Sequence, residues 1–271
     1  AAAAKDAEIL LFADADTSFS PQCVGAAVAL LEERGLDLLS LVSTLTGKRW
    51  YELLVQPAAG VELMRQYPLV LANRDKRRRA FANGQFMMFR AKAYRAVGGH
   101  ESVKQELLED LALARLMEAR GLRAGVFLAD GVMTCRMYRE WAAFRRGWKR
   151  IYTEAASRRA RRLARAARGV RLTGTILPLC ALSLVVAAVI LVPEYLAPWR
   201  YGLAGLGCAA LGTFLAAVGW AYRVSRAPLW AVPGYVIGAW AVGSLLAEAG
   251  KDLRRGTPTT WGGRSYVREN R

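Results

Sequence analysis

The stretch "EILLFADADTSFSP" (residues 8–21) decides how the start of this chain folds. Residues 9–13 form an unbroken apolar run, which is typical of a strand buried on both faces of a sheet. Two carboxylates, Asp14 and Asp16, follow the run directly, and Pro21 ends the stretch. Because ligands of open α/β sheets bind beyond the carboxyl ends of strands, the pattern predicts a strand with a ligand site at its end.

The spacing of the two acids permits two interpretations. Asp-x-Asp brings two negative charges together, and a divalent cation between them would keep both ionised. Alternatively, Asp16, Thr17 and Ser18 cap the helix that Pro21 opens. The motif alone favours neither.

Three long apolar blocks occupy the second half of this 271-residue chain. Residues 172–192, 202–222 and 228–247 contain no charged side chain, and each is close to the ~20 residues that cross a bilayer. The alternative is a soluble core of three buried helices. We expect transmembrane helices, since aromatic residues at the block ends match a membrane interface belt.

The formal net charge of +17 requires an anionic partner, either nucleic acid or a membrane surface. Residues 158–171 carry seven arginines directly before the first apolar block, which is a juxtamembrane pattern. We therefore predict an anionic membrane surface and no nucleic acid. The arginines place residue 171 on the cytoplasmic side of a multi-pass protein of the cell (inner) membrane.

The tail does not fit three full crossings. Three crossings would leave residues 251–271 outside, yet this segment carries six cationic side chains, which favour the inside. We therefore predict that one apolar block is re-entrant or interfacial.

Cysteine and histidine usage argues against a zinc or disulfide framework. The cysteines lie apart without Cys-x-x-Cys spacing, which is typical of a protein whose soluble part lies in a reducing compartment. The only histidine, His100, follows Gly98 and Gly99, so we expect it in a tight turn.

Three further motifs follow in the first half of the chain. "NGQFMMFR" (residues 83–90) contains a predicted short strand at residues 85–90. "ELLEDLALARLM" (residues 106–117) predicts a helix with Glu109 and Asp110 near its start. "RMYREW" (residues 136–141) begins a basic and aromatic helix that suits a membrane interface. Its arginines also match phosphate oxygens.

Taken in this order, these motifs resemble family 2 glycosyltransferases, in particular the membrane-bound, lipid-directed branch that includes ceramide glucosyltransferase-like and hopanoid- or carotenoid-associated enzymes. The closing "TPTTWGGRSY" (residues 257–266) is similar to the tails of that branch. The resemblance implies an α/β fold, a partial nucleotide-diphosphosugar transferase (GT-A) domain followed by α-helical transmembrane segments.

The resemblance also implies a domain order. Residues 1–150 would be the C-terminal part of the cytoplasmic catalytic domain with interfacial helices, and residues 151–171 a basic juxtamembrane helix. Transmembrane helices would fill residues 172–250, before a basic tail at residues 251–271. Family members begin with a strand and loops that hold the nucleotide base. We expect this N-terminal part to be missing, and a chain without it to be inactive.

Site roles follow from the same resemblance. Asp110 would be the general base, and Asp14 and Asp16 would hold Mg2+ or Mn2+ on the donor diphosphate, with Asp16 the more direct ligand. The remaining matched residues would bind the donor: Asn83, Gly84, Gln85, Glu109, Arg136, Arg139 and Trp141. The family's Arg-x-x-Arg-Trp element is interrupted here by Glu140, which leaves the role of Trp141 open.

The implied activity is hexosyltransferase-like: inverting transfer of a sugar from a nucleotide-diphosphate sugar to the hydroxyl of a membrane lipid. One alternative is a processive polysaccharide synthase, although such enzymes carry more spans and begin the arginine element with glutamine. The other is a non-catalytic, basic, membrane-anchored scaffold, which would need neither Asp16 nor Asp110.

Overall fold

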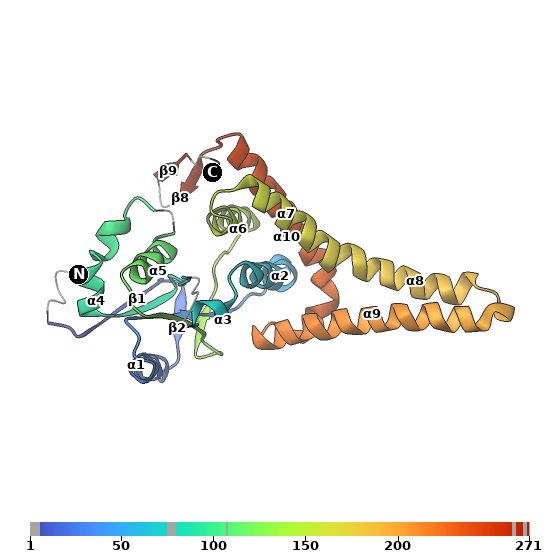
Figure 1. The fold of residues 1–271 in the computed structure, drawn as a ribbon, viewed down its shortest axis with the longest axis horizontal. Helices are drawn as coiled ribbons and strands as arrows, with labels where there is room; N and C mark the ends of the chain where they lie inside the picture. The colour runs from blue at the N-terminus through green and yellow to red at the C-terminus, as the bar shows by residue number, and fades with distance from the viewer. Residues whose placement is uncertain (1–5, 75–79, 107, 262–263, 268–269, 271) are drawn as a thin grey trace. The chain divides into compact units, whose positions relative to one another are not determined.

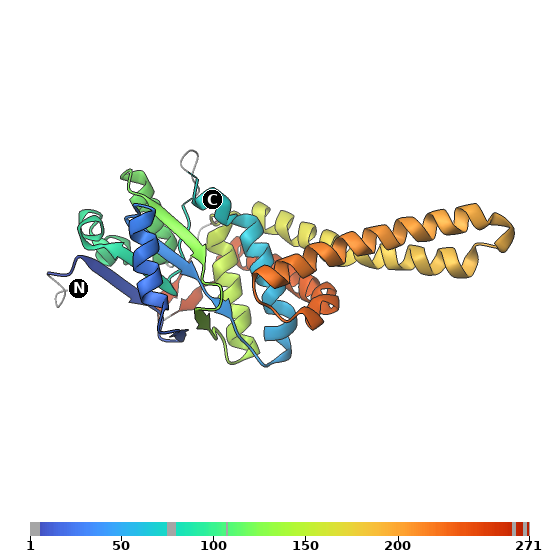
Figure 2. The same cartoon turned by 90° about the horizontal axis from the view of Figure 1, so that it is seen from below.

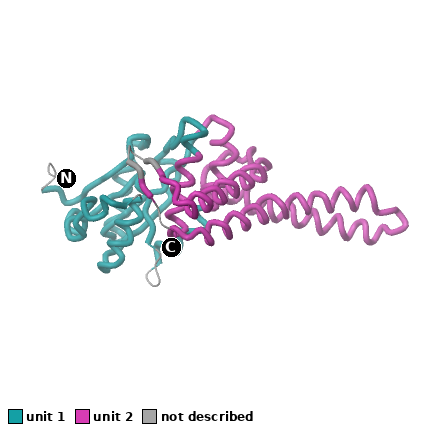
Figure 3. The backbone as a smooth tube through the Cα atoms, turned by 90° about the horizontal axis from the view of Figure 1, so that it is seen from above, with its two compact units in different colours: residues 1–46, 63–144 teal, residues 47–62, 145–271 magenta. Residues whose placement is uncertain are grey.

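The computed structural model describes residues 6–74, 80–106, 108–261, 264–267 and 270 (Figure 1). The chain divides into two compact units (Figure 3). Unit 1 contains residues 1–46 and 63–144, and unit 2 contains residues 47–62 and 145–271. Unit 1 is built from mixed sheets covered by helices and unit 2 is almost entirely helical, in agreement with the predicted fold class.

The main sheet of unit 1 has four strands in the order β1 (Ile9–Ala13), β5 (Phe86–Arg90), β3 (Leu38–Val42) and β6 (Ala124–Leu128). β5 runs antiparallel to both of its neighbours, whereas β3 and β6 are parallel. The carboxyl ends of β1, β3 and β6 and the start of β5 therefore lie together at one end of the sheet.

A second sheet, with three strands, begins at this end of the main sheet. Its order is β2 (Thr17–Phe19), β7 (Met133–Cys135) and β4 (Thr44–Leu45). Each of its strands follows a strand of the main sheet after a short connection, so the chain passes from one sheet to the other three times. Asp14 and Asp16 lie in the first of these connections.

Helices cover both faces of the main sheet (Figure 2). Because side chains alternate along a strand, Met87 and Phe89 of β5 pack toward α4 (Ala91–Ala96) and α5 (Glu109–Ala119), while Phe86 and Met88 pack toward α1 (Cys23–Glu33). All four side chains are at most 1% exposed, so β5 is the centre of the core. The short helices η2 (Gly99–Val103) and α3 (Leu69–Ala72) complete unit 1.

Two expectations for the opening stretch are wrong. Among the described residues β1 is an edge strand, and Leu11 is 38% exposed because only β5 pairs with β1. The capping alternative also fails, since residues 17–19 form β2, and α1 begins after Gln22 with no side-chain cap. The predicted strand itself is confirmed over Ile9–Ala13.

The predicted turn before His100 is confirmed, since Gly98 and Gly99 both have positive φ, at 79° and 56°. The imidazole ring of His100 lies 4.6 Å from the ring of Phe12, and its Nδ1 lies 2.8 Å from the hydroxyl of Tyr94. The same hydroxyl accepts the backbone N–H of His100, so its own proton is free to donate to an unprotonated Nδ1. Burial lowers the pKa of His100, and the Glu109 carboxylate partly offsets this effect.

This contact predicts a loss of stability in mild acid. The folded state holds His100 neutral at a pH where the unfolded chain binds a proton, so stability falls as the pH drops through and below about 6.5. The melting temperature of the detergent-solubilised protein should fall between pH 7.5 and 5.5, and His100→Gln should reduce that fall. An equal fall in both proteins would assign the acid sensitivity to other groups.

Unit 2 contains the apolar blocks. A nearly continuous helix comprises α7 (Ala160–Arg171), the π-helical turn η3 (Leu172–Ile176) and α8 (Leu177–Leu191). After η4 (Glu194–Leu196), α9 (Ala197–Val224) returns antiparallel to α8 and forms a hairpin with it (Figures 1 and 2). The chain ends with η5 (Leu229–Gly234), α10 (Tyr235–Arg254), β8 (Thr259–Trp261) and β9 (Arg264–Tyr266).

Three helices of the described residues are long and apolar enough to cross a membrane: 160–191, 194–224 and 229–254. Each contains one of the apolar blocks expected from the sequence. The hairpin exposes large apolar side chains, and Ile190 and Leu191 are more than 70% exposed. Such a surface indicates a membrane-associated protein.

Two helices depart from expectation. α2 (Trp50–Gln66) runs through Pro57 without a break, although a proline is expected to interrupt a helix. The aromatic residues of α6 (Trp141–Ala155) are not free to face lipid, because Trp148 and Tyr152 are at most 2% exposed. The Tyr152 hydroxyl donates to the carbonyl oxygen of Ala59 at 3.0 Å, and burial raises the pKa of Tyr152 far above its ordinary value.

Candidate active site

All the predicted site residues lie in unit 1. Most of them lie near the strand ends where the chain passes from the main sheet to the three-stranded sheet. Asp14 and Asp16 are exposed in the connection between β1 and β2. The backbone N–H and the hydroxyl of Thr17 both donate to the carbonyl oxygen of Asp14, at 3.2 and 2.6 Å. This turn fixes the backbone that carries the two carboxylates.

Gln85 is the buried centre of the site, with only 5% of its surface exposed. Its Oε1 accepts hydrogen bonds from the hydroxyl of Ser43 at 2.5 Å and from Nδ2 of Asn83 at 2.9 Å. Its Nε2 donates to the sulfur of Cys135 at 3.2 Å. One amide therefore joins the ends of β3, β5 and β7.

Cys135 continues this network to the acidic pair. Its thiol donates a hydrogen bond to the carboxylate of Asp16. Burial raises the pKa of the Cys135 thiol strongly, and the charge and hydrogen bond of Asp16, then the charge of Asp14, raise it further. The thiol therefore stays protonated at neutral pH and donates to Asp16 while it accepts from Gln85.

Asp110 lies at the start of α5 and contacts the same loop. Its Oδ2 accepts the backbone N–H of Gly84 at 2.8 Å, and its Oδ1 accepts the N–H of Leu111 at 2.7 Å. A Cβ at position 84 would lie 3.4 Å from Oδ2, which is an ordinary contact distance, so Gly84 lies directly against the Asp110 side chain.

The loop at residues 83–85 is also held in place by Ser40 of β3. The hydroxyl of Ser40 accepts the N–H of Asn83 at 2.8 Å and lies 3.1 Å from its carbonyl oxygen. Residues 83–85 thus connect Asp110, through Gly84, to Asp16, through Gln85 and Cys135. Acidic groups that are far apart in the sequence belong to one hydrogen-bonded network.

The remaining predicted residues come from the segment after β7 and from the start of α5. The backbone N–H of Arg136 lies 3.4 Å from the carbonyl oxygen of Asp16, and the side chains of Arg136 and Arg139 are exposed. Trp141 stacks on Phe144, with ring centroids 5.3 Å apart. Glu109 is exposed beside Asp110. The sequence also has five cations at residues 74–79, which predict either a solvated loop or a contact with anionic lipid or phosphate; residues 75–79 of this cluster lie outside the described residues.

Sequence reasoning missed three members of the network: Ser40, Ser43 and Cys135. The two serines carry a signal, because they interrupt the apolar run "LDLLSLVS" of β3, and a polar group in a buried strand needs a partner. Cys135 carries none that separates it from an ordinary core cysteine.

The carboxylates of Asp14 and Asp16 suit a cation that also binds a phosphate ligand. In the described part of the chain, no three His, Cys, Asp or Glu side chains gather in a group that could hold a metal. Two exposed carboxylates on one turn are nonetheless what Mg2+ takes from a protein when substrate phosphates and water complete its shell. Asp14 and Asp16 fit that chemistry, and they do not form an all-protein metal cage.

A family model described as Glycosyl transferase family group 2 matches residues 9–242. The chain belongs to this family. No curated protein matches the chain. The match covers both sheets, the network around Gln85 and nearly all of the apolar helices, so the chain is a glycosyltransferase with a GT-A-like α/β domain.

This glycosyltransferase should depend on Cys135 as a positioning residue. Cys135→Val leaves the Nε2 of Gln85 buried without a partner, which should cost about 1–3 kcal/mol of stability and also lower kcat/KM. Cys135→Ser keeps a donor and an acceptor at the same place and should retain most of both. Thermal melts and sugar-transfer assays of the two variants would check this, and an unaltered Cys135→Val enzyme would contradict it.

Proposed function

We propose that this chain transfers a sugar from a nucleotide-diphosphate sugar to the hydroxyl of a membrane lipid, with inversion at the anomeric carbon. The observation that carries the proposal is the hydrogen-bonded network from Asp16 to Asp110 through Cys135, Gln85 and Gly84. A displacement needs a site for the leaving group and a base near the same sugar. The network connects two acidic residues, Asp16 and Asp110, that could serve these two roles.

Asp110 takes the role of general base. Its carboxylate accepts two backbone N–H groups and is only partly buried. These bonds fix the orientation of the carboxylate, and a carboxylate held beside the sugar can accept the proton of an attacking hydroxyl. A single base fits direct displacement, which inverts the anomeric configuration.

The diphosphate would lie near Asp14 and Asp16. Mg2+ or Mn2+ held by these carboxylates would neutralise the charge that develops on the leaving diphosphate. The side chains of Arg136 and Arg139, which are exposed just after β7, would contact phosphate oxygens. Asn83, Gly84 and Gln85 would border the sugar between the diphosphate and Asp110, with Glu109 and Trp141 at the margin of the donor site.

The apolar helices support a lipid acceptor. A hairpin with an apolar exposed surface holds the chain in a bilayer, where an acceptor hydroxyl at the headgroup level is locally concentrated. The exposed arginines of α7 would contact anionic lipid. Since cationic segments favour the cytoplasmic side, the catalytic unit would lie on the cytoplasmic face of the cell (inner) membrane.

The experiment uses membranes that contain the complete gene product. Radiolabelled nucleotide sugars and a lipid extract are supplied with Mg2+ or Mn2+, and the organic phase is analysed by mass spectrometry and NMR. We expect a glycolipid whose anomeric configuration is opposite to that of the donor. Label that appears only in a water-soluble polymer would favour the polysaccharide synthase instead, and retained configuration would remove the direct displacement.

A further inference from the structure

The packing of α10 shows how deep the third apolar helix reaches. Within unit 2, α10 lies antiparallel to α7 and η3. At its start, the hydroxyl of Thr175 donates to the carbonyl oxygen of Val236 at 2.8 Å. Toward its end, a Cβ added to Gly250 would lie 3.4 Å from the Cβ of Leu163. α10 therefore begins level with η3 and runs back along the arginine-rich helix α7.

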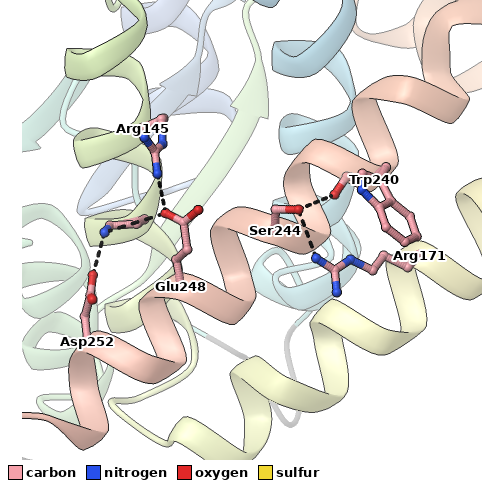
Figure 4. Close-up of polar contacts among 7 residues, drawn as sticks. Arg145, Arg171, Trp240, Ser244, Glu248 and Asp252 are labelled. Atoms are coloured by element: carbon pink, nitrogen blue, oxygen red, sulfur yellow. Dashed lines mark hydrogen bonds and ion pairs between the residues drawn. The ribbon is translucent and has the colours of Figure 1, made fainter.

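The second half of α10 is charged and paired. Glu248 accepts a hydrogen bond from Arg145 of α6 at 2.7 Å, and Asp252 pairs with Lys149 of the same helix (Figure 4). Charged side chains are costly in hydrocarbon and are stable at the level of headgroups or water. The exposed face of α7 next to this segment carries cations as well: Arg161, Arg162, Arg165 and Arg168.

Arg171 marks the boundary between the charged and apolar levels. Its Nη2 donates to the hydroxyl of Ser244 at 2.9 Å, and its Cζ lies 4.7 Å from the ring centroid of Trp240 (Figure 4). Gly243 makes room for this arginine, because a Cβ there would lie 2.5 Å from its Cγ. An arginine beside a half-exposed tryptophan is typical of the membrane interface.

Depth can be measured along the helix from Arg171. The five residues of η3 and the 15 of α8 together make about 30 Å of helix, the thickness of the hydrocarbon layer. Thr175 lies four residues beyond Arg171, or about 6 Å deep, and α10 begins at its level. The rings of Phe214 and Tyr235, whose centroids are 6.0 Å apart, bring the start of α10 against the C-terminal half of α9.

We propose that the chain crosses the bilayer twice, as the α8–α9 hairpin, and that η5 and α10 form a shallow re-entrant element on the lipid surface. Leu229, Trp230 and Ile237, which are exposed and apolar, contact lipid just below the headgroups. No candidate span precedes Ala160 in the described residues, so the tail after α10 shares a side of the bilayer with the catalytic unit. The cationic tail then obeys the charge rule that three crossings would break.

Cysteines introduced one at a time into the full-length protein test this topology, in a background where the exposed Cys180 and Cys208 are replaced by serine and the buried Cys23 and Cys135 are kept. Tyr195→Cys reports the tip of the hairpin, Ser225→Cys the loop after α9, and Thr257→Cys the segment after α10. A membrane-impermeant maleimide is applied to intact cells and to permeabilised cells. We expect position 257 to label like position 225 and opposite to position 195.

Two outcomes would overturn the proposal. Labelling of position 257 like position 195 would mean that α10 crosses the bilayer. Identical labelling of all three positions would mean that the hairpin does not cross. The measurement does not depend on sugar transfer, so its result tests the topology independently of the proposed enzymatic activity.

Depth provides a second measurement. Nitroxide labels are placed at Ile237→Cys in α10 and at Leu182→Cys in the middle of α8, both exposed apolar positions, in reconstituted vesicles. We expect oxygen to relax the label at 182 more strongly, and a water-soluble nickel complex to relax the label at 237 more strongly. Equal depth for the two labels would contradict a shallow α10.

Discussion

Asp110→Asn is expected to lower the rate of sugar transfer by about 10²–10⁴-fold, because an amide cannot accept the proton of the acceptor hydroxyl. The asparagine oxygen can still accept the N–H of Gly84, so the loop at residues 83–85 should stay in place. The bond from Leu111 would be lost, at a cost of about 1 kcal/mol in stability. Activity should therefore fall far more than the melting temperature does.

The matched control for this variant is Glu118→Gln, which removes one carboxylate from the same helix at an exposed position. Glycolipid formation by Glu118→Gln membranes should equal that of the wild type. Saturating donor and acceptor should not rescue Asp110→Asn, since the loss lies in kcat. A folded Asp110→Asn enzyme with normal kcat would remove Asp110 from the mechanism.

Local patterns in the sequence predicted some of the elements of unit 1. The apolar runs that became β1 and β5 and the helix that carries Glu109 and Asp110 were found nearly to their ends. These elements depend on residues next to one another in the chain. The prediction that β1 is buried on both faces failed because exposure depends on which strand pairs with it, and β5 comes more than 70 residues later.

The candidate site was only partly visible in the sequence for the same reason. A resemblance to a family marked Asp16, Gln85 and Asp110, but nothing in their spacing shows that Cys135 would join them. That contact needs β7 to lie between β2 and β4. The packing of α10 was likewise not visible, because hydropathy does not show which helix a segment packs against.

Asp16→Asn should be the most damaging change at the donor end of the site. It removes one carboxylate from the proposed cation site, and we expect the Mn2+ concentration for half-maximal activity to rise at least about tenfold, with kcat/KM falling by about 10²–10³-fold. Paramagnetic resonance of Mn2+ with inorganic pyrophosphate would measure binding without catalysis. The control Asp6→Asn removes an exposed acid just before β1 and should bind Mn2+ normally.

The reactivity of the Cys135 thiol in Asp16→Asn distinguishes a metal-binding role of Asp16 from a purely structural one. The Asp16 carboxylate contributes to the raised pKa of that thiol, so Asp16→Asn should lower the thiol pKa and speed its alkylation at high pH. A purely structural aspartate would change thiol reactivity while leaving the Mn2+ requirement as it was. Cys135→Ser should show the converse, with a nearly normal Mn2+ requirement, because serine can donate to Asp16 as the thiol does.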